Sequence, residues 1–228
     1  MQLKKTATTT SLALALALTA TLGLGACGSN DSATSAASSP NLRTTAATAV
    51  ATVPAVPGGS TAVALDADFV AALGTLGLTP GILGGATLAD GTVTFPVTGG
   101  TVTLYDRESG YRPWVQGVLF HEGSGLSLTA GGTKVDLTDF TIDPGKPARL
   151  FGNVSVNGQL AASSAPLFNL DGSTLKPPTM TADGSAVLAG TGVKLSPEAA
   201  VLLNQTFSTN ALAGGLLIGT STITVQTK

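Results

Sequence analysis

The chain has 228 residues, of which 43% are hydrophobic and only 11% are charged, and its formal net charge is −2 at pH 7. This weakly acidic balance excludes the basic surface that nucleic-acid binding requires. The chain has one cysteine. It cannot form an internal disulfide, so its stability must come from an ordinary buried core.

The first 26 residues have the order of a secretory signal peptide. Lys4 and Lys5 give a positive start, and residues 12–24 form an almost uninterrupted apolar run. This run is shorter than the roughly 17–25 residues that a membrane-spanning helix needs. We therefore expect residues 1–26 to direct export and then to be removed.

Leu24, Gly25, Ala26 and Cys27 resemble the lipobox of bacterial lipoproteins. The resemblance implies that Cys27 becomes the acylated amino terminus, with palmitate or a similar chain, on the extracytoplasmic face of the cell membrane. Each buried methylene contributes roughly 0.8 kcal/mol, so several acyl chains hold stably where one holds weakly. The alternative is an ordinary secretory signal with a chance cysteine.

Residues 27–60 begin with Cys27 and continue mainly as Ser, Thr, Ala, Asn and Pro, with few large apolar side chains. Such a segment cannot bury enough surface to offset its ordering entropy. We expect a flexible tether, and the alternative is an irregular arm that packs on the domain. Residues 61–228 are then expected to form one domain.

Two short helices are predicted in that domain. Asp66 is a typical amino-terminal cap after a strand at 61–65, and Gly77 and Pro80 would end the helix. Ser196 caps the second helix, and Pro197 occupies its first position.

Strands account for most of the remaining pattern. The clearest pair is the hairpin of 126–130 and 133–137, because Gly131 and Gly132 between them permit a tight primed turn. We expect four side chains of this hairpin to share a buried face: Leu126, Leu128, Val135 and Leu137. Further strands are predicted at 92–95, 101–105, 115–120, 140–142, 149–156, 160–162, 166–170, 185–188, 192–195 and 218–225. Many short strands at close spacing predict a mainly β domain, an antiparallel sandwich or barrel-like fold with two short helices.

The sequence carries no strong catalytic motif. His121 is the single histidine, and Ser124 lies in a Glu-Gly-Ser-Gly sequence that lacks the leading glycine of a nucleophile elbow. One histidine cannot supply a closed zinc site. We therefore predict a protein that is not an enzyme.

Two groups of carboxylates offer alternative functional sites. Asp136, Asp139 and Asp143 lack the dense loop with a distal glutamate that calcium binding favours, so a solvated strand face is expected. Asp106 and Glu108 are two carboxylates that could form a glycosidase pair, but the adjoining Arg107 and the turn-like Ser109-Gly110 favour an exposed loop. No metal site is predicted.

The best candidate for a binding surface is the aromatic segment 105–114. It contains Tyr105, Tyr111 and Trp114, which are both tyrosines and the only tryptophan of the chain. With His121, they are the predicted ligand-binding residues. The alternative is a long hairpin loop whose Trp114 packs under the sheet.

Residues 117–128, with the hairpin that follows, resemble the middle of the HtaA domain, a β-rich cell-surface domain of actinobacteria that carries haem. Residues 195–225 are also similar in outline. The resemblance implies that haem iron is held by the tyrosine of a helical Phe-x-x-Tyr pattern, supported by a histidine. Phe69 matches this phenylalanine, but Ala72 occupies the tyrosine position, and His121 is displaced by one position. A methyl group cannot ligate iron, which leaves Tyr105, Tyr111 or His121 as substitutes.

The predicted function is that of an exported, lipid-anchored, non-enzymatic protein of the envelope or bacterial cell surface, with a binding or structural role. The alternative is a module that binds haem or another small ligand, and an enzyme ranks third. The expected partner is the membrane, through the lipid on Cys27, with no nucleic acid. No cofactor is predicted apart from haem in the alternative.

Overall fold

The computed structural model describes residues 47–228. The predicted signal peptide, lipobox and Cys27 lie outside these residues. The described part contains thirteen strands and two α-helices. They are β1 (Ala49–Val53), β2 (Gly59–Leu65), α1 (Ala67–Thr75), β3 (Thr79–Gly84), β4 (Thr87–Ala89), β5 (Thr92–Pro96), β6 (Gly99–Tyr105), β7 (Val115–Ala130), β8 (Thr133–Asp143), β9 (Arg149–Val156), β10 (Gln159–Asp171), β11 (Thr179–Met180), β12 (Ala186–Leu195), α2 (Pro197–Phe207) and β13 (Leu217–Val225). Two short 3-10 helices, η1 (Arg107–Ser109) and η2 (Gly172–Thr174), lie in loops.

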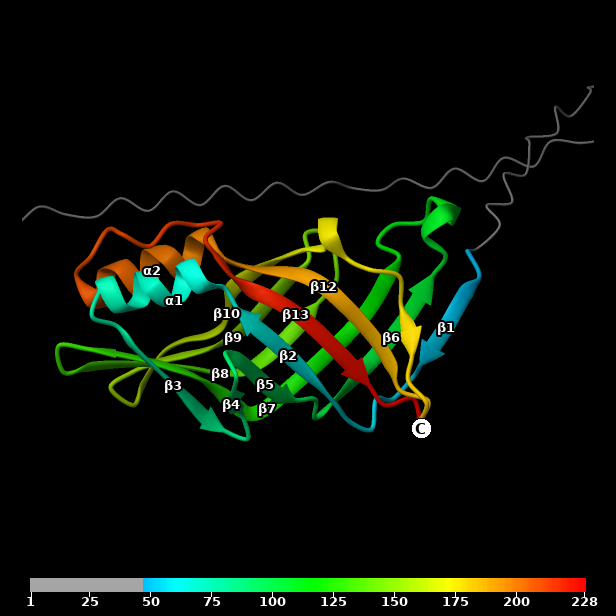
Figure 1. Ribbon diagram of the computed structural model, residues 1–228, viewed down its shortest axis with the longest axis horizontal. Coiled ribbons are helices and arrows are strands. Elements are labelled where there is room, and N and C mark those ends of the chain that lie inside the picture. Colours follow the sequence, from blue (N-terminus) through cyan, green and yellow to red (C-terminus); the bar gives the residue numbers. More distant parts are fainter. Residues whose placement is uncertain (1–46) are drawn as a thin grey trace, which may run out of the picture. The chain divides into compact units, whose positions relative to one another are not determined.

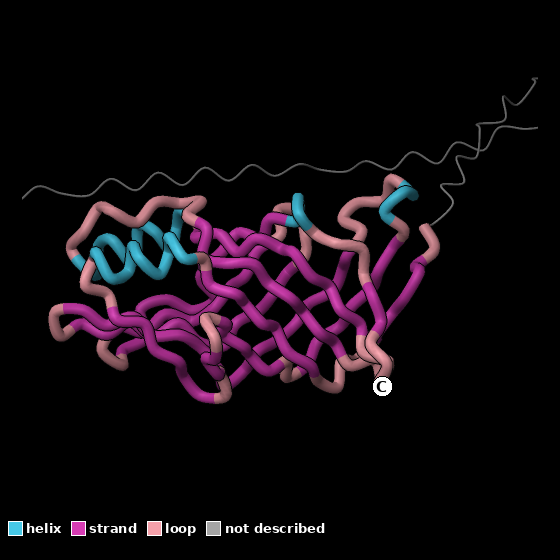
Figure 2. Tube along the Cα trace, in the orientation of Figure 1, coloured by secondary structure: helices cyan, strands magenta, loops and turns pink. Residues whose placement is uncertain are grey.

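All strands belong to one antiparallel sheet, with the order β1-β6-β7-β8-β9-β10-β12-β13-β2-β5-β4, and β3 and β11 pair beside β7 and β12. The sheet curls on itself, so that its long strands cross one another in the view of Figure 2. Both α-helices lie at the end of the domain away from β1 (Figure 1). The mainly β, antiparallel fold with two helices is confirmed, in its barrel-like form rather than as two separate sheets.

The domain begins earlier than residue 61. β1 pairs with β6, and Val53 and Val56 are buried, so the predicted tether is wrong over residues 49–60. The average composition of residues 27–60 concealed the strand, because the valines of this segment all lie within residues 50–56. Two buried valines help to fix this segment against an existing sheet edge.

Both predicted helix caps are confirmed. Asp66 Oδ1 accepts hydrogen bonds from the backbone N–H groups of Asp68 and Phe69 at 3.0 and 3.1 Å. Ser196 Oγ accepts from the N–H of Ala199 at 2.9 Å. The same hydroxyl donates to the carbonyl of Pro166 at 2.6 Å, which ties α2 to β10.

The predicted glycine hairpin is also confirmed. Gly131 and Gly132 have φ values of 56° and 82°, as a type I′ turn requires. In the predicted buried face, Val135 and Leu137 are buried. Their register partners Leu128 and Leu126 are only half-buried.

Two strand predictions need correction. The segments predicted at 115–120 and 126–130 are one strand, β7, which continues through an irregularity between His121 and Gly125. β3 was missed because Pro80 and its glycine neighbours are typical breakers. Pro80 is tolerated there because β3 pairs with β7 only and is an edge strand.

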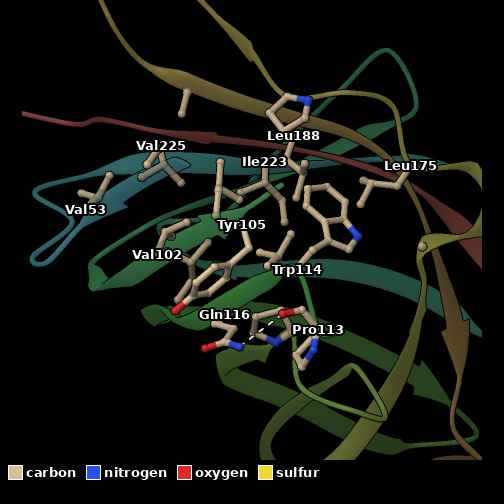
Figure 3. Close-up of a pocket in the computed structure, with 18 of the residues that line it drawn as sticks. Val53, Val102, Tyr105, Pro113, Trp114, Gln116, Leu175, Leu188, Ile223 and Val225 are labelled. Atoms are coloured by element: carbon tan, nitrogen blue, oxygen red, sulfur yellow. Dashed lines mark hydrogen bonds between the residues drawn. The ribbon is translucent and has the colours of Figure 1, made fainter. Parts of the chain in front are cut away.

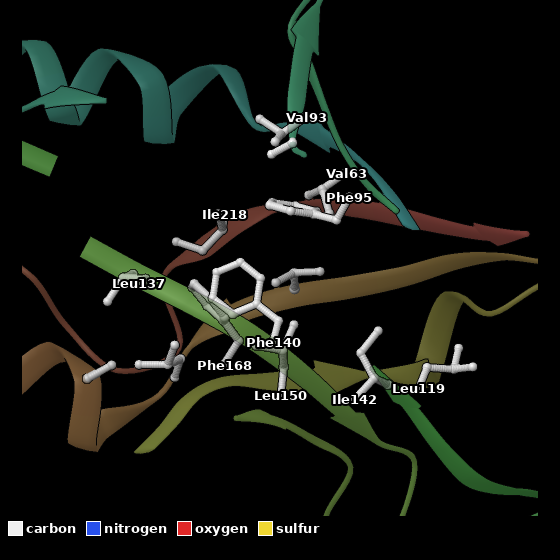
Figure 4. Packing of buried hydrophobic residues seen from close by; sticks show 14 of the residues in the cluster. Val63, Val93, Phe95, Leu119, Leu137, Phe140, Ile142, Leu150, Phe168 and Ile218 are labelled. Carbon is white, nitrogen blue, oxygen red and sulfur yellow. The ribbon is translucent and has the colours of Figure 1, made fainter. Parts of the chain in front are cut away.

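The core fills one part of the interior of the curl (Figure 4). Phe95 and Phe140 meet edge to face, with ring centroids 5.3 Å apart. Around them lie Val63, Val93, Leu137, Leu150, Phe168 and Ile218. No helix within residues 47–228 combines the length and the apolarity needed to span a membrane.

Candidate functional site

A cavity of about 1000 Å³ opens between two parts of the curled sheet. β1, β6 and β7 form one wall, and β12 and β13 form the opposite one. Segments 105–116 and 170–180 add to the lining, and Ile142, Pro144 and Ala148 complete it. Strands far apart in the sheet order therefore enclose one space.

The walls of this cavity are predominantly apolar. In Figure 3, Val102 and Trp114 come from one wall, and Leu188, Ile223 and Val225 come from the other. The volume and the apolar character are those of a pocket that binds a small molecule. Charge is confined to Asp106, Arg107 and Glu108 among the lining residues.

The predicted aromatic segment forms part of the cavity. Tyr105 and Trp114 line it, whereas Tyr111 is 40% exposed and packs its ring 4.5 Å from that of Tyr105. The guanidinium of Arg107 lies 4.9 Å from the centroid of the Trp114 ring. Arg107 also donates from Nη1 to the carbonyl of Leu175 at 3.2 Å, which links the aromatic segment to the loop after η2.

His121 lies elsewhere. It is 1% exposed and lines a separate apolar pocket of only about 40 Å³, with Phe95 and Phe140. Its Nδ1 is 3.3 Å from the carbonyl of Phe140, and its Nε2 is 2.8 Å from Thr61 Oγ1. A carbonyl can only accept, so Nδ1 carries the proton and Nε2 accepts from the Thr61 hydroxyl.

Burial sets the charge of His121. Desolvation lowers the pKa of the imidazole from 6.5 to about 4, although the hydrogen bond to the Phe140 carbonyl opposes this shift. The ring is therefore neutral at pH 7, and both of its nitrogens are engaged. The ring is part of the packing and of a buried hydrogen-bond pair.

The remaining polar candidates have structural partners. Ser124 Oγ donates to the backbone carbonyl of His121 at 3.0 Å, not to its ring. Asp139 accepts from the N–H of Gly123, from Thr138 and from Asn153 at 3.0, 2.9 and 3.2 Å. The Gly123 N–H is the main cause that holds the pKa of Asp139 below its usual value. Within residues 47–228, no group of three or more His, Cys, Asp and Glu side chains is placed to hold a metal ion.

Asp106 also has a structural role. Its Oδ1 accepts from the N–H of Glu108 at 2.9 Å and so caps η1. This geometry does not support a glycosidase pair, because the carboxylate of Asp106 is hydrogen-bonded to the backbone N–H of Glu108.

Sequence reasoning missed the wall formed by β12 and β13. Thr191 and Ser221 are 9% and 2% exposed, and both line the large cavity. Ser221, Ile223 and Val225 alternate along β13 and face inward, which is a period-two signal. That signal marks an inner face, but only the curl of the sheet shows that the face borders a cavity.

No protein-family model matches the chain, and no curated protein matches it. Among solved structures, the C-terminal domain of HtaA from Corynebacterium glutamicum is similar, with a TM-score of 0.51 and 15% sequence identity over 75% of this chain and 99% of that domain. The heme-binding protein HtaB from the same organism matches with a TM-score of 0.46 and 11% identity, over 78% of this chain and 96% of its own. The match to the HtaA domain shows that the described domain has an HtaA-like fold, as the sequence resemblance predicts.

Proposed function

We propose that the domain is a non-enzymatic binding module that encloses a large, predominantly apolar small molecule in the cavity between β6 and β12–β13. The observation that carries this proposal is the size of the cavity, about 1000 Å³, together with its apolar walls. A soluble domain gains nothing from leaving so much apolar surface in contact with water. A ligand that buries this surface explains it.

The residues at the positions that correspond to the family's haem site do not fit haem. Ala72 offers no ligand atom, and both nitrogens of His121 are hydrogen-bonded in a pocket of about 40 Å³. The large cavity is different, because Tyr105 lines it and a tyrosine oxygen is one of the ligands that haem iron accepts. Haem is therefore the second candidate, for this cavity only.

Titration with an uncharged fluorophore tests the module. Trp114 is the only tryptophan and lines the cavity. Energy transfer from Trp114 to N-phenyl-1-naphthylamine is expected to saturate at one probe per protein. Haem in place of the probe decides the second candidate: a saturable shift of the Soret band that is lost in Tyr105→Phe and kept in Tyr111→Phe would favour it. Transfer that never saturates, with a Soret band unchanged from that of free haem, would remove both proposals.

For the location, the proposal rests on the sequence, since Cys27 lies outside the described residues. We infer that Cys27 is lipidated and anchors the domain to the outer face of the cell membrane. In detergent phase partitioning, the exported wild-type protein is expected in the detergent phase and Cys27→Ser in the aqueous phase. Ser29→Ala serves as the matched control and should behave as wild type. Retention of Cys27→Ser in the detergent phase would defeat the inference.

A further inference from the structure

Two hydroxyl side chains lie where the large cavity meets the core. Thr191 on β12 and Ser221 on β13 are register partners, which places their Cβ atoms about 5 Å apart. Val63, the partner of Ser221 on β2, and Val193 already line the small pocket around His121. Thr191 and Ser221 therefore form the inner end of the large cavity, where it adjoins the small pocket.

A bulge in β12 produces this arrangement. The β12–β13 register shifts between Ala189 and Thr191, and Gly190 between them has a φ of 98°. The extra residue lets Leu188 and Thr191 both face the cavity, although their spacing of three would otherwise place them on opposite faces. A Cβ at Gly190 would lie 2.4 Å from the carbonyl oxygen of Thr174, so this position requires glycine.

The two hydroxyls have unused hydrogen-bonding capacity. Among the side-chain hydrogen bonds of residues 47–228, none involves Thr191 or Ser221. Neither hydroxyl oxygen is among the fully buried side-chain atoms that lack a hydrogen-bond partner. What little surface they expose therefore faces the cavity. An apolar molecule that excludes water from this end of the cavity would leave both hydroxyls unpaired, which is costly, so a ligand that fills the cavity is expected to bring a hydrogen-bonding group to them.

The charge around the pair restricts that group. The charged lining residues are Asp106, Arg107 and Glu108, which all lie in the aromatic segment. Asp106 and Glu108 are exposed, and Arg107 is held by the Trp114 ring and the Leu175 carbonyl. An ion at the inner end would be buried without a partner of opposite charge, which is strongly unfavourable. A neutral oxygen, as a hydroxyl or a carbonyl, needs only the hydrogen bonds that two hydroxyls can give.

We propose, resting on the proposed function, that the ligand is an elongated apolar molecule with a neutral hydrogen-bonding oxygen at one end, and that Thr191 and Ser221 bind this oxygen at the inner end of the cavity. The pair then selects among apolar molecules, because a molecule without the oxygen leaves both hydroxyls unpaired.

Displacement of the fluorophore by two matched molecules tests this. 4-Octylphenol and octylbenzene have the same body and differ by one terminal hydroxyl. The wild-type protein is expected to bind octylphenol about tenfold more tightly than octylbenzene. In the double variant Thr191→Val/Ser221→Ala, the affinity for octylphenol should fall about tenfold, while the affinity for octylbenzene should change less than twofold. Thr222→Val is the control, because Thr222 is exposed on the outer face of β13 and does not line the cavity, so both affinities should stay within twofold of wild type.

The outcomes separate the two proposals. If both molecules displace the probe equally well from wild type and double variant, the selection by the hydroxyl pair is wrong and the binding module stands. If the double variant binds both molecules more weakly than wild type, and by the same factor, the hydroxyl pair only shapes the cavity, and the proposal is again wrong. If neither molecule nor the probe binds the wild-type protein, the proposed function fails first. Ser221→Ala alone gives the same comparison if the double variant does not fold.

Discussion

A Val102→Trp substitution is expected to weaken binding of the uncharged fluorophore by at least about 30-fold. Val102 lines the cavity from β6, and Figure 3 shows it close to Tyr105 and facing the wall of Ile223 and Leu188. An indole in place of an isopropyl group would occupy the space that the ligand needs. Loss of about 2 kcal/mol of binding free energy corresponds to this change in affinity. The fluorophore's own emission gives the measurement, because the variant adds a second tryptophan.

The control for this variant is Val70→Trp. Val70 lies on α1, is 48% exposed and is not a lining residue of the cavity. Val70→Trp introduces the same indole on the surface, so the affinity of this variant for the fluorophore should stay within twofold of wild type. Equal affinity of Val102→Trp and wild type, with both folded, would show that the probe binds somewhere else.

The second large effect concerns acid stability. The free energy of unfolding is expected to fall by about 2 kcal/mol between pH 7 and pH 5 because of His121. Its pKa is about 4 in the folded protein and near 6.5 when unfolded. As the pH falls below 6.5, the unfolded chain takes up a proton that the folded chain cannot bind until pH 4. The stabilisation is therefore complete above pH 6.5 and is lost as the pH approaches 4.

The double variant Thr61→Val/His121→Phe removes both members of the hydrogen-bonded pair and leaves no orphaned hydroxyl. Its free energy of unfolding, measured by urea denaturation, should be nearly constant between pH 7 and pH 5. His121 is the only histidine in the chain, so no other side-chain type ordinarily titrates in this window. The carboxylates with lowered pKa, such as Asp139, act at lower pH. An unchanged slope in the double variant would contradict the assignment.

Local signals allowed the sequence to predict much of the fold. The caps Asp66 and Ser196 and the turn at Gly131–Gly132 act within a few residues, and each appears where its chemistry predicts it. β1 and β3 escaped prediction for the opposite reason. The composition of residues 27–60 as a whole concealed the valines of β1, and β3 includes Pro80; both become strands because β6 and β7 offer them edges to pair with.

Prediction of the site was limited by non-local structure. Tyr105 and Trp114 were identified because aromatic residues are scarce in the chain, and both line the cavity. The opposite wall comes from strands about 80 to 120 residues further along the chain, brought there by the curl of the sheet. No local pattern in β12 or β13 indicates that Thr191 and Ser221 face a cavity. His121 was identified by its chemistry alone, and its burial could not be read from its neighbours.

The most direct measurement of the central claim is a crystal structure with an alkylphenol that carries bromine on its ring. The account predicts one anomalous bromine peak inside the cavity, between the walls that contain Val102 and Leu188. A cavity that holds only water, with bromine on the outer surface of the sheet or nowhere in the crystal, would contradict it.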